Sequence, residues 1–241
     1  GNVSGGGSVA TAMLIGNGSQ LATDAHVFIN PETLERRDPL SDCMFINQYD
    51  HKPIRLDFSG GKTYKFYTSS PKSEWYKDRA IVRLKGRVLG AHPFPMDFDR
   101  TQIRPGDKLI MISASQKQMA ASITTFKFTA PINNGKNVFD MDLNSEPIAQ
   151  GCTAMAYYGP PAYTFSALYS DCSSTVEASG SITFIRTADG ELRAKALAVE
   201  SAGPLSDFKP FKVGKEVAPQ DLSFTLSVGL SADVNSDAAQ L

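Results

Sequence analysis

Hydrophobic positions in this chain fall in short runs that polar residues, glycines and prolines interrupt. The runs are rich in β-branched and aromatic side chains, and they lack the 3.6-residue periodicity of a long amphipathic helix. The earlier runs are SVATAMLI, QLATDAHVF, CMFINQ, PIRLDF, TYKFYT and RAIVRL. The later ones are KLIMISA, ASITTFKFTA, NVFDMDL, TAMAYYG, SGSITFIR, LRAKALAVES and LSFTLSV. The pattern predicts an all-β protein, with helix limited to one short turn at NPETLERR, where Pro31 follows Asn30.

A proline-rich segment, GAHPFPMDFDRTQIRPGD, separates the two sets of runs. It predicts a linker near residues 90–105 and two β-rich units, residues 1–95 and 96–241. Many short strands with turn signals between them favour barrels or sandwiches, and ligand sites favour the interface between two such units. We expect the glycines of SGGGS to form a flexible lead-in and the polar stretch SADVNSDAAQL to fray at the C-terminus.

Composition narrows the classes of partner. The 241 residues carry a formal net charge of −1, are 41% hydrophobic and 20% charged, and show no basic stripe. This balance is typical of a globular protein and argues against nucleic-acid binding. No stretch approaches the ~20 apolar residues of a membrane helix, and no signal peptide is recognisable. No His or Cys cluster has zinc spacing and no phosphate-binding loop is present, so neither a metal nor a cofactor is expected.

The chain contains three cysteines, Cys43, Cys152 and Cys172. A bridge between Cys152 and Cys172 would close a loop of about 20 residues and stabilise the fold by roughly 3 kcal/mol on the chain-entropy estimate. Cys43 would then remain unpaired. The alternative is three reduced thiols in a cytosolic protein, and the sequence leaves both open.

Three local patterns carry groups suited to acyl transfer. LATDAHVF places His26 at the end of a predicted strand, YKDRAIVRLKG places Asp78 directly before one, and EASGSITFI places Ser179 before a glycine and another strand. A serine hydroxyl needs a base to take its proton, and histidine titrates in the right range. A carboxylate behind the ring fixes its tautomer and stabilises the imidazolium. The pattern favours a His26, Asp78 and Ser179 relay in the cleft between the two units.

Each of these residues also has a structural interpretation. His26 alone is more typical of a packed core histidine, Asp78 of a strand-edge charge, and Ser179 of a turn. Asp50 and Asp57 compete with Asp78, but neither precedes so apolar a strand. Ser173 and Ser174 lie near Ser179, but no glycine follows either. The order and the setting of the three patterns favour the catalytic interpretation.

Together the patterns resemble those of the trypsin-like serine peptidases, the chymotrypsin-fold superfamily, and look closest to its secreted bacterial members. LATDAHVF is similar to the family's Thr-Ala-Ala-His block with Asp24 in place of an alanine, KDRAIVRL to its Asp-x-Ala block, and EASGSI to its Gly-x-Ser-Gly-x-Pro block. The resemblance spans about residues 8–205. It implies two six-stranded antiparallel barrels with His26 as general base and acid, Asp78 as orienting carboxylate and Ser179 as nucleophile.

The resemblance further implies an oxyanion hole made by the backbone amides of Glu177 and Ser179. The family has glycine where this chain has Glu177, and a side chain there can hold the amide turned outward. The leading hypothesis is an endopeptidase. The alternative hypothesis is a catalytically impaired binding protein of the same fold, and an esterase would share the same relay.

Substrate contacts and location follow from the same resemblance. Ser173 falls at the base of the primary specificity pocket, and Ser201, Ala202 and Gly203 resemble the strand that walls it. A neutral base argues against strict preference for Arg or Lys. The resemblance and the possible disulfide imply a secreted or periplasmic protein acting on peptides or proteins, with a monomer favoured. Histidine protonation predicts loss of activity below about pH 6 to 7.

Overall fold

The protein is described by a computed structural model. It describes residues 2–5, 8–37, 40–47, 52–67, 78–96, 103–113, 127–128, 131–132, 136–137, 141–142, 148–158, 167–172, 179–204 and 223–229. Within these ranges the chain is all β-strand and connecting segments, apart from two 3₁₀ turns, η1 (Ala25–Val27) and η2 (Leu40–Asp42). The prediction of an all-β fold is confirmed.

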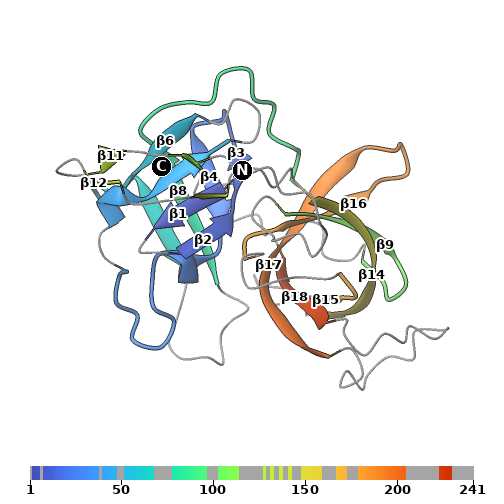
Figure 1. Cartoon of the computed structure of the whole chain (residues 1–241). Helices are drawn as coiled ribbons and strands as arrows, with labels where there is room; N and C mark the ends of the chain where they lie inside the picture. The colour runs from blue at the N-terminus through green and yellow to red at the C-terminus, as the bar shows by residue number, and fades with distance from the viewer. Residues whose placement is uncertain are drawn as a thin grey trace.

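The N-terminal part forms one curled antiparallel sheet of eight short strands (Figure 1). Its strands are β1 (Asn2–Gly5), β2 (Ser8–Thr11), β3 (Met13–Ile15), β4 (Gln20–Thr23), β5 (Met44–Ile46), β6 (Pro53–Asp57), β7 (Tyr64–Tyr67) and β8 (Arg79–Leu84). They follow the order β2-β1-β5-β6-β8-β4-β3, and β7 pairs with β8 off this path. β8 therefore has β4, β6 and β7 as partners along its length.

The C-terminal part closes into a six-stranded barrel, seen at the other side of Figure 1. Its order is β14-β15-β18-β17-β16-β9. The strands are β9 (Lys108–Ser113), β14 (Ile148–Tyr158), β15 (Ala167–Ser170), β16 (Ile182–Arg186), β17 (Leu192–Pro204) and β18 (Ser223–Gly229). Two small hairpins lie between β9 and β14 in sequence, and they pair β10 (Lys127–Phe128) with β13 (Met141–Asp142) and β11 (Pro131–Ile132) with β12 (Lys136–Asn137).

The two parts share a hydrophobic layer. In β9 the buried positions alternate with less buried ones, as expected for a strand with one face in a barrel core. β8 is buried at almost every position because its inner face fills the first core while its outer face meets the second barrel. Ile81 from β8 and Phe184 from β16 belong to one buried cluster. This layer fixes the two parts relative to each other, which a site built from both requires.

Two local expectations need correction, and one strand was not expected. SGGGS is not only a lead-in, because Asn2–Gly5 forms β1 and pairs with β2 and β5. NPETLERR forms no helix: the Asn30 side chain accepts the Glu32 N–H, Leu34 has φ 60°, and Ile29 pairs with Arg36, which together make a tight reversal. β15 was too short to stand out in the sequence. The predicted tail, residues 231–241, lies outside the described residues, and the 95/96 boundary stays a prediction.

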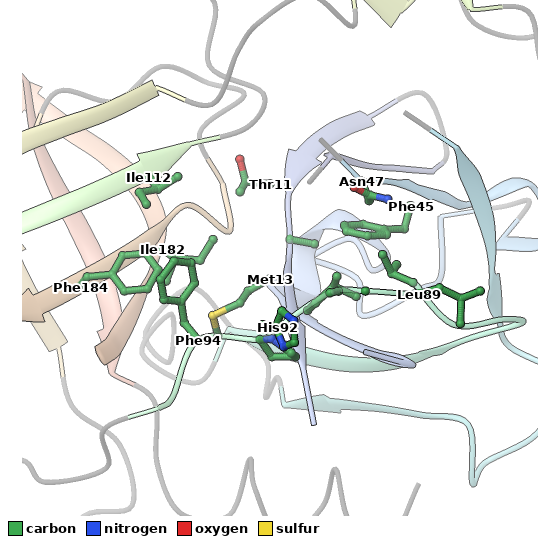
Figure 2. A pocket seen from close by; sticks show the side chains of 16 residues that line it. Thr11, Met13, Phe45, Asn47, Leu89, His92, Phe94, Ile112, Ile182 and Phe184 are labelled. Atoms are coloured by element: carbon green, nitrogen blue, oxygen red, sulfur yellow. The ribbon is translucent and has the colours of Figure 1, made fainter. Parts of the chain in front are cut away.

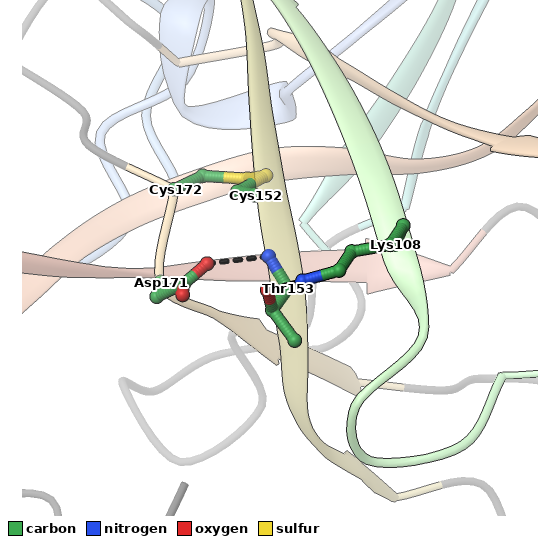
Figure 3. The surroundings of a disulfide bond; sticks show 5 residues. All are labelled: Lys108, Cys152, Thr153, Asp171 and Cys172. Carbon is green, nitrogen blue, oxygen red and sulfur yellow. Dashed lines mark hydrogen bonds between the residues drawn. A yellow bond between two sulfur atoms is a disulfide. The ribbon is translucent and has the colours of Figure 1, made fainter. Parts of the chain in front are cut away.

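The predicted disulfide is confirmed. Cys152 in β14 bonds to Cys172, just after β15, with the Cα atoms 5.0 Å apart (Figure 3). Next to it, Asp171 accepts a hydrogen bond from the Thr153 backbone N–H, which ties the same two strands together. Cys43 carries a free thiol buried in the first core, and burial raises its pKa to about 12. Such a thiol is a packing residue and a poor nucleophile.

Candidate functional site

The ends of two paired strands bring His26 and Asp78 together. β4 and β8 are antiparallel neighbours in which Thr23 lies opposite Ala80. The chain leaves β4 at Thr23 and turns into η1, which holds His26, while Asp78 lies immediately before β8. Residues separated by 52 positions in the sequence therefore meet at one edge of the sheet. Both strands are apolar because they pack in the first core, and their pairing places His26 next to Asp78.

Asp78 contacts His26 with both carboxylate oxygens. Oδ2 lies 2.6 Å from the ring Nδ1, and Oδ1 accepts the backbone N–H of His26 at 2.9 Å. Two bonds from one carboxylate fix both the ring and the backbone of His26. The Asp78 side chain is 13% exposed and that of His26 24%, so the pair is largely shielded but still reached by solvent.

The other ring nitrogen faces Ser179. His26 Nε2 lies 2.9 Å from Ser179 Oγ, across 153 residues of sequence. Ser179 sits in the turn that enters β16, a strand of the second barrel. The structure thus brings together the three residues that the sequence patterns selected, in the order carboxylate, imidazole, hydroxyl. An imidazole between a carboxylate and a hydroxyl can accept the hydroxyl proton.

Glycine is required directly after Ser179. Gly180 has φ +76°, in the left-handed region that side chains disfavour, and a Cβ atom there would clash with the Thr11 carbonyl oxygen and come within 2.5 Å of Thr23 Oγ1. The Ser179 carbonyl oxygen in turn accepts the Thr11 N–H at 2.8 Å. The turn is therefore pressed against β2 and β4 of the first sheet.

The surroundings of His26 favour its protonated form. Burial by itself lowers the pKa of the ring, but the hydrogen bond to Asp78 and the negative charges of Asp78 and Asp24 outweigh burial and raise the pKa to about 9. The Arg37 charge acts weakly in the opposite direction. The ring is thus held as an imidazolium up to a higher pH than a free histidine would be.

One residue of the site was not assigned a role from the sequence. Asp24 is fully buried, and its Oδ2 accepts the backbone N–H of Gly180 at 2.7 Å. A charged residue inside an otherwise buried strand end was the available signal. The sequence could not supply the partner, which lies 156 residues away.

Several of the other predicted residues are not described by the structure. They are Glu177 and Ser173, together with Asp50 and Ser174, the alternatives to Asp78 and Ser179. Ser201, Ala202 and Gly203 lie in β17, which pairs there with β18 and has an irregularity between Ala202 and Pro204. Asp57, the other competitor, lies in β6, where its side chain accepts bonds from Ser59.

A second feature, a cavity, lies between the two parts. A cavity of about 340 Å³ is lined by Thr11 and Met13 from the first sheet, by the segment around Phe94, and by Ile112 and Phe184 from the barrel (Figure 2). His26, Asp78 and Ser179 do not line it.

Among the described residues, no group of three or more His, Cys, Asp or Glu could hold a metal ion. Nor does that part of the chain include a helix long and apolar enough to span a membrane.

Comparison with solved structures identifies the architecture. A thermostable serine protease, AL20, from an extremophilic microorganism aligns over 98% of this chain and 92% of its own, with 13% identity and a TM-score of 0.54. A Glu endopeptidase aligns over 99% and 89%, with 10% identity and a TM-score of 0.58. The chain has the chymotrypsin fold. The sequence itself matches no protein-family model and no curated protein.

The chymotrypsin fold is shared by proteins of different function. A mutant of human heparin binding protein (CAP37) aligns over 98% of this chain and 87% of its own, with 9% identity and a TM-score of 0.58. Its name refers to heparin binding, whereas the other two neighbours are named for proteolysis. At these identities the likeness establishes the fold alone, so a proposal about function must rest on the residues of the site.

Proposed function

We propose that this protein is a serine endopeptidase that cleaves peptide bonds through an acyl-enzyme. The observation that carries the proposal is the chain of contacts from Asp78 through His26 to Ser179, at 2.6 Å and 2.9 Å. Ser179 Oγ attacks the substrate carbonyl carbon while His26 Nε2 takes the hydroxyl proton. His26 then gives that proton to the leaving amine. Water attacks the acyl-enzyme by the reverse sequence, which releases the acid and restores Ser179.

Asp78 acts through His26. Its Oδ2 accepts the Nδ1–H, which leaves Nε2 free to accept a proton, and its charge stabilises the imidazolium formed during attack. We assign the oxyanion hole to the backbone amides of Glu177 and Ser179, and the substrate pocket to Ser173, Ser201, Ala202 and Gly203. A pocket based on neutral Ser173 would not require a cationic side chain in the substrate. No cofactor enters this proposal.

The setting of the site supports a role outside the cytosol. Disulfides such as Cys152–Cys172 persist in oxidising compartments and are rare where thiols are kept reduced. We therefore propose a secreted or periplasmic protein that acts on peptide or protein substrates as a monomer. The units of residues 1–95 and 96–241 would each contribute part of the site.

A fluorophosphonate probe tests the function directly. Because such probes react with an activated serine hydroxyl, we expect the protein to take one label, located on Ser179 by mass spectrometry, and to cleave an unfolded protein such as reduced casein. Comparing ester and amide substrates with the same acyl group distinguishes a peptidase from an esterase.

The same experiment decides between the enzyme and the binding-protein alternative, for which Glu177 is the motive. A protein that takes no label and cleaves nothing contradicts the enzyme proposal. If the Glu177→Gly variant of that inert protein then labels at Ser179, the impaired oxyanion hole is the cause. Labelling and turnover by the unmodified protein exclude the alternative.

The activity should depend on pH through the protonation of His26. Only the neutral ring can act as a base, and the pKa of His26 is raised to about 9. kcat/KM should therefore fall as the pH drops below about 9, rather than below pH 6 to 7 as an unperturbed histidine would predict. Steady-state rates between pH 5 and 10 measure this limb, with circular dichroism at each pH as the control for unfolding. A limb centred between pH 6 and 7 would show that the carboxylates do not act on the ring as described.

A further inference from the structure

Asp24 is a buried carboxyl group that the proposed mechanism does not use. It is 0% exposed, and burying a carboxyl group costs free energy unless its interactions compensate. Aspartate directly before a helix usually accepts a bond from an N–H of the first turn. Asp24 precedes η1 but makes no such bond. Its oxygen is directed instead to the second barrel.

The contact joins one particular peptide group to the first sheet. Asp24 Oδ2 accepts the Gly180 N–H at 2.7 Å, and the Ser179 carbonyl oxygen accepts the Thr11 N–H at 2.8 Å. These are the two polar ends of the Ser179–Gly180 peptide. The same Gly180 N–H also lies 2.7 Å from the Ala198 carbonyl oxygen of β17, so it is shared between an acceptor in each part.

We propose that Asp24 is a positioning residue that sets the orientation of the Ser179–Gly180 peptide relative to the segment that carries His26. The proposal deepens, and rests on, the proposed serine peptidase. Asp24 is two residues from His26, and its Oδ2 lies 4.0 Å from the ring Nδ1. The short segment from Asp24 to Val27 therefore has two roles. Its turn η1 holds the imidazole of His26, and the Asp24 side chain holds the turn that carries Ser179. The separation of His26 Nε2 and Ser179 Oγ is then fixed from the histidine side.

The role requires an acceptor oxygen and no negative charge. Burial raises the pKa of Asp24 well above its usual range, and the charge of Asp78 raises it further, while His26 and the Gly180 bond act in the opposite direction. The second oxygen, Oδ1, is buried and makes no hydrogen bond to the residues that the structure describes. Asparagine has the same shape and keeps one carbonyl oxygen, so it should replace Asp24. Valine has a similar shape and no acceptor.

These two variants form a matched test. Asp24→Val should remain folded, because the Gly180 N–H keeps Ala198 as acceptor and an apolar side chain is tolerated in a buried site. We expect kcat to fall about 10- to 100-fold with KM changed by less than about 3-fold, since small misplacement of a nucleophile slows the chemical step. Asp24→Asn should stay within about 3-fold of the unmodified protein in kcat and in the rate of fluorophosphonate labelling. Both are measured at a pH above the acid limb, because loss of the Asp24 charge would also lower the pKa of His26.

Asp171→Ala is the control, since it removes a carboxylate that also accepts a backbone N–H but lies beside the disulfide. Its kcat should not change. The proposal is overturned if Asp24→Val keeps full kcat, or if Asp24→Asn is as slow as Asp24→Val. If the unmodified protein neither labels nor cleaves, the proposed function fails. A crystal structure of Asp24→Val then decides whether Asp24 positions Ser179 relative to His26. A separation of His26 Nε2 and Ser179 Oγ unchanged from 2.9 Å would then refute the positioning role.

Discussion

Replacing Ser179 with alanine is expected to lower kcat for a peptide substrate by about 10⁶-fold, the scale seen when the nucleophile of such a relay is removed. The reason is that the proposed acyl-enzyme forms only through Ser179 Oγ, which lies 2.9 Å from the base. No neighbouring group among the described residues occupies an equivalent position toward His26 Nε2. Binding should change little, because the hydroxyl contributes to the reaction and only slightly to the pocket.

The measurement is single-turnover kinetics on a chromogenic peptide, with binding of the same peptide followed by calorimetry. Ser181→Ala is the matched control, since it removes a hydroxyl two residues away that is buried and makes no hydrogen bond to the described residues. It should retain nearly full activity. If Ser179→Ala keeps more than about one per cent of the activity, a different nucleophile acts and the proposed mechanism is wrong.

Asp78→Asn is expected to lower kcat by about 10⁴-fold, although the side chain keeps its shape. An amide in place of the carboxylate can present an N–H to His26 Nδ1, and the ring proton then lies on Nε2. A protonated Nε2 cannot accept the proton of Ser179. The imidazolium also loses its nearest negative charge. Because Asp78 raises the pKa of His26, the acid limb of the residual activity should move to lower pH.

Two readouts separate this effect from misfolding. The pH profile reports the charge on Asp78, and the thermal unfolding midpoint reports the fold. Asp57→Asn is the control, because Asp57 competed with Asp78 in the sequence but bonds to Ser59 in β6. It should leave kcat and the profile unchanged. A profile that does not move in Asp78→Asn would mean that Asp78 has no electrostatic action on His26.

Much of this protein was predictable from local sequence. Alternating and continuous apolar runs identified most strands, because a strand must bury one or both faces, and the run RAIVRL became β8 with its partners on both sides. The short β1 and β15 were missed because their sequences, NVSG and ALYS, each contain only one β-branched or aromatic residue. NPETLERR was misjudged because the Asn30 side chain and the positive φ of Leu34 favour a reversal over the helix that Pro31 indicated.

The sequence by itself determined the all-β class and the residue types that make acyl transfer possible, since both depend on side-chain chemistry and on spacing along the chain. It selected His26, Asp78 and Ser179 and allowed the Cys152–Cys172 bridge. Only the tertiary structure decided how these groups meet, because their contacts depend on which strands pair and on how the curled sheet packs against the barrel across a shared apolar layer. The raised pKa of His26 depends on Asp78, which the pairing of β4 with β8 brings to the ring. The bond from Gly180 to Asp24 depends on the packing of the second part against the first.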